Sequence, residues 1–537
     1  MSSTQTIDDN HCSLQTVHEM TTEQRTSNLP PAGSRLAKQS CQSCKLRKRR
    51  CTRELPECRL CIRGRRSCSY QSIHHMENQH LHSEIDPSAA VSEQTLRNDF
   101  PVAFFLDPTL FNCCALLATP VCPLPIPPKV EDILGDIHSK KALAAEYFKT
   151  ANRWMPILSE IRFYGSLINP LPYADPGVTS ILLGMKLLLS CPEEANLCSE
   201  IYAVAKEFLL RMEMAGHLSI YTVQSAILIA MYEMGHAIFP GAFTTVSTCA
   251  RYAISLGING TLPIQGKAWV EQEERNRTWW AILILDRSIN LGFRGRHLCT
   301  PDPSANSILP VDDDAWNQGV LPENQSQNLL STPSLKNGRY ACLAQAVNLL
   351  SQVFRHISSR EEALRLDLDN IAQLERTLFA LEHLASFEEQ ERNICYLSSI
   401  AICYSSVLLL RTAYLSEPHE ALTEEGKELS QHSIRQVLVK TLSHFQRFRD
   451  GWGSRDRFPP LALDWLYRTA VAHIFLAYDA KSSEWDKDIG ELKEALDFVG
   501  QRWRVAITHA LDQSGPDLNT LPPAELSASP NAEARSV

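Results

Sequence analysis

The chain has 537 residues, of which 44% are hydrophobic and 21% are charged, a composition typical of a globular protein with a sizeable core. Its net charge of −9 gives by itself no indication of a nucleic-acid partner. The average hides an asymmetry, however. The segment from Cys41 to Tyr70 holds ten Lys or Arg and two Glu, a net of +8, so the rest of the chain sums to −17.

The first part of the chain is polar. Residues 1–38 are rich in Ser, Thr, Gln and Asn and have no hydrophobic period, which predicts a disordered N-terminus. The first 30 residues lack the apolar stretch of a secretory signal, so we expect a reducing compartment. In such a compartment, closely spaced cysteines bind metal more often than they form disulfides.

Six of the 17 cysteines lie within residues 41–68, in the spacing C-x2-C-x6-C-x6-C-x2-C-x6-C. These candidate metal ligands are Cys41, Cys44, Cys51, Cys58, Cys61 and Cys68. Zinc favours four tetrahedral ligands, so two ions need eight ligand positions. Six thiolates can fill them only if two of the sulfurs each bind both ions. Because the sequence is two near-copies of C-x2-C-x6-C, we predict a pseudo-twofold arrangement with one bridging sulfur from each half.

The cysteine pattern has three alternative interpretations. A single four-cysteine zinc site would leave two spare thiols. A RING or LIM interaction module usually includes His ligands, and no His occurs within residues 41–68. A disulfide knot would require a secreted protein, which the polar N-terminus argues against.

Residues 39–71 closely resemble the DNA-binding domain of fungal binuclear zinc cluster transcription factors. The resemblance rests on the six cysteines, the basic run at 45–50 and Pro56 in the connecting loop, whereas Thr52 replaces a residue that is often acidic. It implies two Zn²⁺ ions bridged by the first and fourth cysteines, Cys41 and Cys58. By the same resemblance, Cys44 and Cys51 complete one site, and Cys61 and Cys68 complete the other.

The basic residues of this block predict contacts with double-stranded DNA. A short helix beginning near Cys44 would carry basic side chains into the major groove. The resemblance implies that Arg47 and Lys48 meet the base edges of CGG-like triplets. The remaining predicted DNA-binding residues, which would meet phosphates, are Lys45, Arg49, Arg50, Arg63, Arg65 and Arg66. The runs 45–50 and 63–66 are also candidate nuclear import signals.

Residues 72–101 are polar, which predicts a linker. The alternative is a dimerising coiled coil, which would need sustained heptads. The apolar residues that fail to sustain them are Ile73, Met76, Leu81 and Ile85.

Residues 102–511 predict one large all-α regulatory domain, because apolar residues recur at spacings of three and four and strand-like alternation is nearly absent. Three such stripes are Ile201, Val204, Phe208 and Met212; Ile371, Leu374, Leu378 and Leu381; and Leu492, Ala495, Val499, Trp503 and Ala506. The predicted fold class is therefore mainly α, with a small two-zinc six-cysteine domain, a large helical domain and disordered termini. The disordered C-terminal tail is predicted at 512–537. The heptad-like segment 371–385 could pair subunits, but such segments are more often core helices.

Two segments of this region need separate interpretations. Residues 393–410 carry no charge, and we predict a buried core helix rather than a membrane span. Residues 300–337 contain five prolines, which predicts a long loop. Within it, the acidic run 312–314 beside Trp316 is interpreted as solvated, with an acidic activation segment as the alternative.

Residues 275–302 resemble part of the regulatory domain that follows the zinc cluster in many members of the same family. The matching residues are Trp279, Trp280, Asp286, Arg287, Gly295 and Arg296, while His297 replaces the usual proline. We favour a structural role, with buried tryptophans and an Asp-Arg pair that joins helices. An effector pocket is the alternative.

The sequence lacks the common catalytic motifs, so no enzyme is predicted. We predict a nuclear, sequence-specific transcription factor, in keeping with a pathway-specific activator of metabolic or secondary-metabolite genes. Its expected partners are DNA and the transcription machinery or co-regulators, with no membrane, and homodimerisation is left open. The rival hypotheses are a regulator that binds another zinc-cluster factor instead of DNA, and an enzyme tethered to chromatin.

Overall fold

The computed structural model divides the chain into two compact units, Met1–Thr95 and Leu96–Val537. In the first unit it describes residues 37, 40–47, 49–55, 57–64 and 68. In the second it describes residues 124–168, 175–191, 199–259, 268–292, 297–320, 328–329, 338–358, 367–417, 422–452, 455–480 and 485–506. The predicted linker and C-terminal tail, and all of the predicted disordered N-terminus except residue 37, lie outside these residues.

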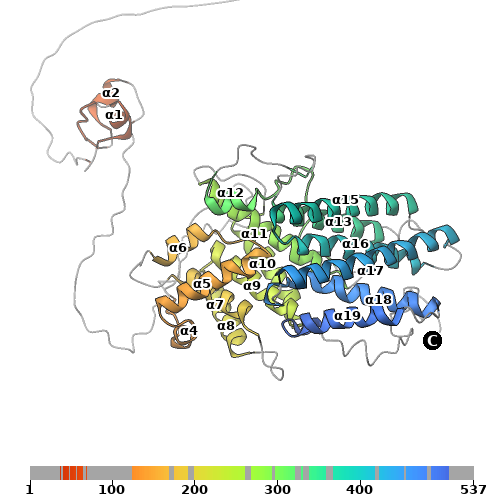
Figure 1. The fold of residues 1–537 in the computed structure, drawn as a ribbon. Helices are drawn as coiled ribbons and strands as arrows, with labels where there is room; N and C mark the ends of the chain where they lie inside the picture. The colour runs from red at the N-terminus through yellow and green to blue at the C-terminus, as the bar shows by residue number, and fades with distance from the viewer. Residues whose placement is uncertain are drawn as a thin grey trace, which may run out of the picture. The chain divides into compact units, whose positions relative to one another are not determined.

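The N-terminal unit contains two short helices, α1 (Gln42–Leu46) and α2 (Arg59–Arg63), shown in Figure 1. Each helix begins directly after a cysteine, Cys41 or Cys58, whose extended backbone occupies the N-cap position. The repeated sequence half therefore folds twice into the same local structure, a cysteine followed by one short helix.

The C-terminal unit is built from helices. Its first half contains α4 (Pro128–Leu134), α5 (Ile137–Lys149), η2 (Ala151–Arg153), α6 (Glu160–Ile168), α7 (Pro176–Leu189), α8 (Glu200–Met214), α9 (Ile220–Gly235), α10 (Gly241–Ser255), α11 (Trp269–Ser288) and α12 (Asp313–Gln318). Its second half contains α13 (Arg339–Ser358), α15 (Leu368–Arg392), α16 (Leu397–Leu415), α17 (Glu424–Trp452), η3 (Arg455–Arg457), η4 (Pro460–Ala462), α18 (Leu463–Ala480), α19 (Trp485–Gly500) and η5 (Arg504–Ala506). The described residues form no strand, and the mainly α prediction is confirmed.

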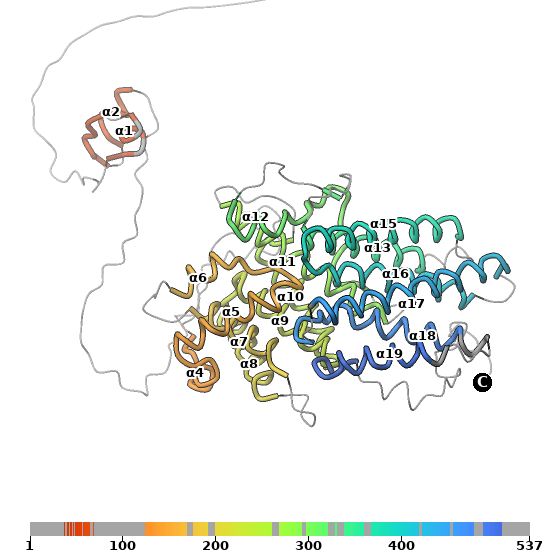
Figure 2. Tube along the Cα trace, viewed as in Figure 1, coloured from red at the N-terminus to blue at the C-terminus, as the bar shows by residue number. Residues whose placement is uncertain are grey.

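Helix α16 lies at the centre of the second half, packed against α13, α15, α17 and α18 (Figure 2). It is long and apolar enough to cross a membrane, but 94% of its most apolar window is buried by its neighbours. The core helix predicted at 393–410 is therefore present. It begins later than expected because Asn393, with φ of 52°, ends α15 in a left-handed conformation.

The three predicted apolar stripes lie largely in the core. All four stripe residues of α15 are buried, which is the position expected of a core helix. In α8 the stripe is buried except for the half-buried Ile201. The third stripe outlasts its helix, because α19 ends at Gly500 and Trp503 lies in the turn beyond it. Trp503 is nevertheless fully buried and donates a hydrogen bond to the carbonyl of Phe458 at 2.9 Å.

The interpretation of the acidic run as solvated was wrong. Asp312 caps α12, because its carboxylate accepts hydrogen bonds from the backbone N–H groups of the following residues. Asp313 is buried and pairs with Arg277 of α11 at 2.7 Å, and the Arg277 guanidinium lies 4.1 Å from the ring centre of buried Trp316. Only Asp314 remains exposed. The run is thus a helix start fixed to the core rather than a solvated loop.

Candidate metal centre and nucleic-acid interface

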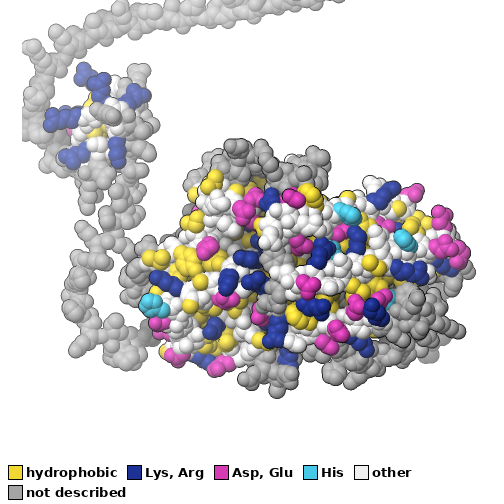
Figure 3. Space-filling view, in the orientation of Figure 1, with side chains coloured by type: hydrophobic (Ala, Val, Ile, Leu, Met, Phe, Trp, Pro, Cys, Tyr) yellow, Lys and Arg dark blue, Asp and Glu magenta, His cyan; other side chains and the backbone are white. Residues whose placement is uncertain are grey.

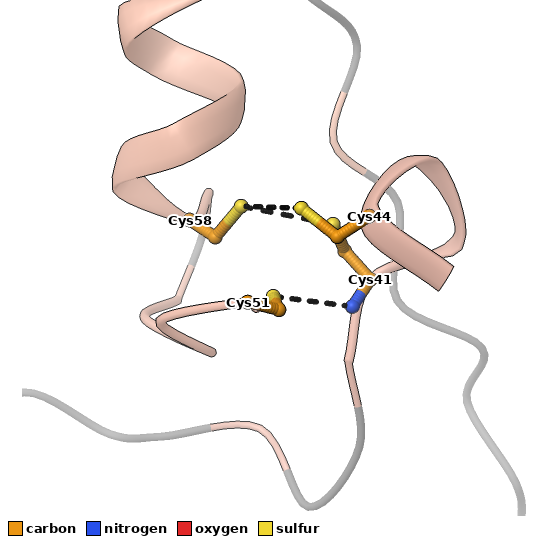
Figure 4. Close-up of side chains that lie close together, drawn as sticks. All are labelled: Cys41, Cys44, Cys51 and Cys58. Carbon is orange, nitrogen blue, oxygen red and sulfur yellow. Dashed lines mark hydrogen bonds between the residues drawn. The ribbon is translucent and has the colours of Figure 1, made fainter. Parts of the chain in front are cut away.

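The six cysteines converge in the N-terminal unit. The sulfur of Cys58 lies 3.6 Å from that of Cys41 and 3.7 Å from that of Cys44 (Figure 4). The sulfur of Cys41 also lies 3.7 Å from that of Cys61. A disulfide would require about 2.05 Å, and all six cysteines are free. Four sulfurs arranged tetrahedrally at about 2.3 Å from one zinc ion would be separated by about 3.8 Å. The spacing therefore suits zinc thiolate coordination.

The backbone holds the sulfurs in two equivalent halves. The backbone N–H of Cys41 donates to the sulfur of Cys51 at 3.4 Å, and the N–H of Cys58 donates to the sulfur of Cys68 at 3.3 Å. Both bonds join residues ten apart, and both donors cap a short helix. This repetition is the local basis of a pseudo-twofold cluster.

The sulfurs form two groups of four, each with all its sulfurs within 4.8 Å of one another. One group contains Cys41, Cys44, Cys51 and Cys58, and the other contains Cys41, Cys58, Cys61 and Cys68. The groups share Cys41 and Cys58. Six sulfurs in this arrangement can complete two tetrahedra if these two are common to both.

The electrostatics of the cluster favour a bound cation. Burial raises the pKa of the Cys41 thiol, and it raises the pKa of Cys44 to about 12. Burial acts in the same direction on Cys58, but hydrogen bonds from Cys61 and the other thiols lower its pKa to about 6. Buried thiolates so close together are stable only if positive charge compensates them, and zinc supplies that charge as it displaces their protons.

The basic side chains surround this cluster on the outside. Lys45, Arg47, Arg49, Arg50 and Arg63 are all exposed, and Figure 3 shows basic side chains spread over the visible face of the N-terminal unit. The other three predicted DNA contacts, Lys48, Arg65 and Arg66, lie outside the described residues.

The short helix predicted near Cys44 is present as α1, although it begins two residues earlier. Helix α1 begins at Gln42 and ends at Leu46, so Lys45 lies in its last turn and Arg47 is its C-cap. Its N-terminus is at the cysteine cluster, where the helix dipole favours thiolates. The basic side chains thus begin at the C-terminal end of α1 and continue in the residues after it.

The sequence did not reveal the role of Thr52. Its hydroxyl accepts a hydrogen bond at 3.0 Å from the N–H of Arg59, the first residue of α2. Arg59 in turn pairs with Glu54 at 2.9 Å. Thr52 therefore satisfies a free N–H at the start of α2, which is compatible with its standing where related domains often have an acidic residue.

The segment at 275–302, with its two tryptophans and Asp-Arg pair, is structural. Trp279 and Trp280 are buried, and Trp280 donates to the carbonyl of Ile308 at 2.8 Å. Asp286 accepts from the backbone and hydroxyl of Thr300, while Arg287 reaches Asp302 and the Ser351 hydroxyl of α13. These bonds join α11 to the following loop and to α13, as the structural interpretation predicted. Gly295 and Arg296 lie outside the described residues, and exposed His297 lies beyond them.

Comparison with protein families yields two matches. Residues 39–75 match the fungal Zn(2)-Cys(6) binuclear cluster domain, and residues 144–386 match the fungal specific transcription factor domain. The first match contains all six cysteines, and the second contains the Trp279–Trp280 segment.

Individual relatives have related names. The chain is 31% identical over 180 residues to the transcription factor BOA15 of Botryotinia fuckeliana, a match that covers 33% of this chain and 98% of the relative. It is 29% identical over 119 residues to the transcription regulator galc of Aspergillus niger, covering 22% of this chain and 14% of the relative. It is 23% identical over 268 residues to an ABC-transporter-regulating transcription factor of Aspergillus oryzae, covering 47% and 28%. The last two similarities are thus to limited parts of longer proteins.

Proposed function

The chain belongs to the fungal Zn(2)-Cys(6) binuclear cluster transcription factors, and we propose that it reads CGG-like triplets in the major groove with residues 39–71. Membership makes the protein a transcriptional regulator that holds two zinc ions, and its relatives are transcription factors rather than enzymes, in agreement with the sequence prediction. The observation that carries the proposal is the pair of four-sulfur groups in a unit whose described cations face outward.

We assign the zinc ligands from the two sulfur groups. Cys44 and Cys51 would bind one ion and Cys61 and Cys68 the other, with Cys41 and Cys58 bridging the two. The metal would supply cross-links in a unit too small to bury a large apolar core. The cysteines would thereby hold α1 and the exposed cations after it in a fixed arrangement for DNA.

The positions of the basic residues suggest which of them would contact bases and which would contact phosphates. Arg47, at the end of α1, and Lys48, the next residue, would meet guanine O6 and N7, the commonest specific contact of basic side chains. Lys45, Arg49, Arg50, Arg63, Arg65 and Arg66 would meet phosphates and set affinity without sequence preference.

Selection of bound sites from a random DNA pool by the full-length zinc-loaded protein tests this function. We expect enrichment of a CGG-like element and loss of that enrichment when a strong chelator removes the zinc. Paired elements would indicate a dimer and give its spacing, and single elements would indicate a monomer. Zinc binding without any enriched sequence would contradict direct reading and favour the rival regulator that binds another zinc-cluster factor.

Two substitutions separate base reading from phosphate binding. Arg47→Ala should cost about 1–3 kcal/mol of discrimination between the preferred triplet and a mismatched one. Lys45→Ala should weaken binding to both sequences alike and reduce the salt slope of log K by about 0.9. Fluorescence anisotropy titrations at several salt concentrations measure both quantities.

The matched control for these variants is Arg251→Ala, which removes an exposed arginine from α10 of the helical unit. It should leave both the discrimination and the salt slope unchanged. If Arg47→Ala reduced the affinity for matched and mismatched DNA equally, the assignment of Arg47 to a base edge would be wrong.

We extend the proposal to the cell and to the rest of the chain. The protein would act in the nucleus as a pathway-specific activator of metabolic or secondary-metabolite genes. Residues 72–101 would link the reader to a regulatory domain at 102–511, flanked by disordered ends at 1–38 and 512–537. The regulatory domain is supported by the family match within residues 144–386 and by the helices that continue to residue 506.

A further inference from the structure

The helical unit contains a cavity of about 420 Å³, and no residue of α11 lines it. Its walls come from the segment after α5, from α12, from the junction between α15 and α16, and from the segment between α17 and η4. Trp154 and Arg457 hold two of these walls together, because the indole N–H donates to the Arg457 carbonyl at 2.8 Å. The volume is within the range of small-molecule sites, about 300–1,000 Å³.

Four arginines line this cavity: Arg153, Arg339, Arg392 and Arg457. Arg392 is neutralised by Asp312 and Glu388, each at 2.7 Å. Arg339 pairs with Asp313, whose carboxylate oxygen lies 3.6 Å from the Nε atom. Among the described residues, Arg153 and Arg457 form no ion pair.

The unpaired arginines also repel one another. Partial burial, together with the charges of Arg339 and Arg457, lowers the pKa of the Arg153 guanidinium. Like charges that face one space destabilise one another, although the exposure of Arg153 to solvent weakens this effect. A bound anion would remove this repulsion.

Buried polar atoms of the lining residues also lack partners. Asn152 and Tyr396 are 7% and 1% exposed, and the Asn152 Oδ1 and Tyr396 Oη atoms have no hydrogen-bond partner among the described residues. A buried polar group without a partner costs roughly 1–3 kcal/mol. Because both atoms are closed off from solvent, a ligand in the cavity would reach them only after a local shift of their side chains.

The remaining lining limits what the ligand can be. Phe148, Trp154 and Phe448 contribute aromatic surface, which suits an apolar body. The carboxylates that line the cavity are Glu160, Asp313 and Asp314. Arg392 is already neutralised and Asp313 is paired with Arg277, which leaves three positive side chains against two negative ones, a net +1. This balance favours a singly charged anion over a multiply charged one.

We propose that this cavity is a binding site for a small organic monoanion, a carboxylic acid with an aromatic or branched apolar body. Its acid group would pair with Arg153, Arg457 and Arg339, and its body would lie against the aromatic residues. The site is confined to the helical unit, so the proposal stands or falls independently of DNA reading.

Two dyes of nearly the same shape test the proposal on the full-length protein. The first is 8-anilino-1-naphthalenesulfonate, a monoanion, and the second is N-phenyl-1-naphthylamine, which lacks the sulfonate. We expect one saturable site for the anionic dye and at least tenfold weaker binding of the neutral one, measured by fluorescence titration. Benzoate should displace the anionic dye, as a carboxylate that shares the site.

Substitutions assign the binding to the arginines. Arg457→Gln and Arg153→Gln should each weaken binding of the anionic dye by about ten- to a hundredfold, the effect of losing a charge-assisted hydrogen bond, and should leave the neutral dye unaffected. The control Arg376→Gln removes an exposed arginine of α15 that does not line the cavity and should change neither affinity. Equal losses in all three variants, unaltered binding in the cavity variants, or unsaturable binding of the anionic dye would each overturn the proposal.

Thermal unfolding distinguishes a binding role from a structural one. If Arg153 and Arg457 serve a ligand, the ligand-free Arg153→Gln and Arg457→Gln proteins should unfold at the wild-type temperature or above it, because a repulsive charge has been removed. Added benzoate should raise the unfolding temperature of the wild type more than that of either variant. A lower unfolding temperature of both ligand-free variants would show that these arginines hold the fold together, which contradicts the proposal.

Discussion

Cys58→Ser should abolish binding of both zinc ions, whereas Cys51→Ser should abolish only one. The sulfur of Cys58 belongs to both groups of four, so its loss leaves three thiolates in each. The sulfur of Cys51 belongs to one group, and its loss leaves Cys41, Cys58, Cys61 and Cys68 intact. Because a structural zinc site contributes about 10–16 kcal/mol to folding in small domains, the Cys58 variant should also lose DNA binding entirely.

Zinc content per chain, measured by atomic emission on the purified full-length proteins, gives the result directly. We expect two ions in the wild type, close to none in Cys58→Ser and Cys41→Ser, and one in Cys51→Ser and Cys68→Ser. The control Cys191→Ser, at an exposed cysteine of the helical unit, should retain two. If Cys58→Ser and Cys51→Ser each kept one ion, the sulfurs would not be shared and the bridging assignment would fail.

The cysteine cluster was predictable because its information is local. Two copies of C-x2-C-x6-C lie within 28 residues, and the ligand count of zinc then demands sharing. The structure brings these sulfurs together within 4.8 Å in each group. The stripe of α15 was equally local, since spacings of three and four place its apolar residues on one face.

The differences from the sequence predictions arose where a distant residue decides the outcome. The start of α1 depends on Cys41 acting as N-cap while its N–H bonds to the sulfur of Cys51, and spacing alone did not indicate that bond. Trp503 is buried although its helix has ended, because Phe458, 45 residues earlier, accepts its hydrogen bond. The cavity depends even more on distant residues, because the residues that line it are spread along the chain from Phe148 to Pro459.

Asp313 is another residue whose position the sequence alone does not predict. The three consecutive aspartates 312–314 look alike in sequence, but only Asp313 is buried in the fold. Asp313→Ala should lower the free energy of unfolding of the helical unit by about 3–5 kcal/mol, because it leaves the fully buried Arg277 without its partner at 2.7 Å. Glu273, also 2.7 Å from Arg277, remains and keeps the loss from being larger. Asp314→Ala, at the exposed neighbour, should change stability by less than about 0.5 kcal/mol.

Urea unfolding followed by circular dichroism measures both variants, and its pH dependence tests the cause. Burial alone would raise the pKa of Asp313, but Arg277 and Arg339 hold it below the ordinary value. A carboxylate with a lowered folded pKa stabilises the protein fully above its unfolded pKa, about 3.9, and this stabilisation is lost as the pH falls through the folded value. The gap between wild type and Asp313→Ala should therefore be constant near neutral pH and narrow only in acid. The assignment would be contradicted if Asp314→Ala lowered the free energy of unfolding as much as Asp313→Ala does. It would also be contradicted if the difference between wild type and Asp313→Ala stayed the same at acidic pH values at which both proteins are folded. Either result would show that charge pairing with Arg277 is not what fixes α12 to the core.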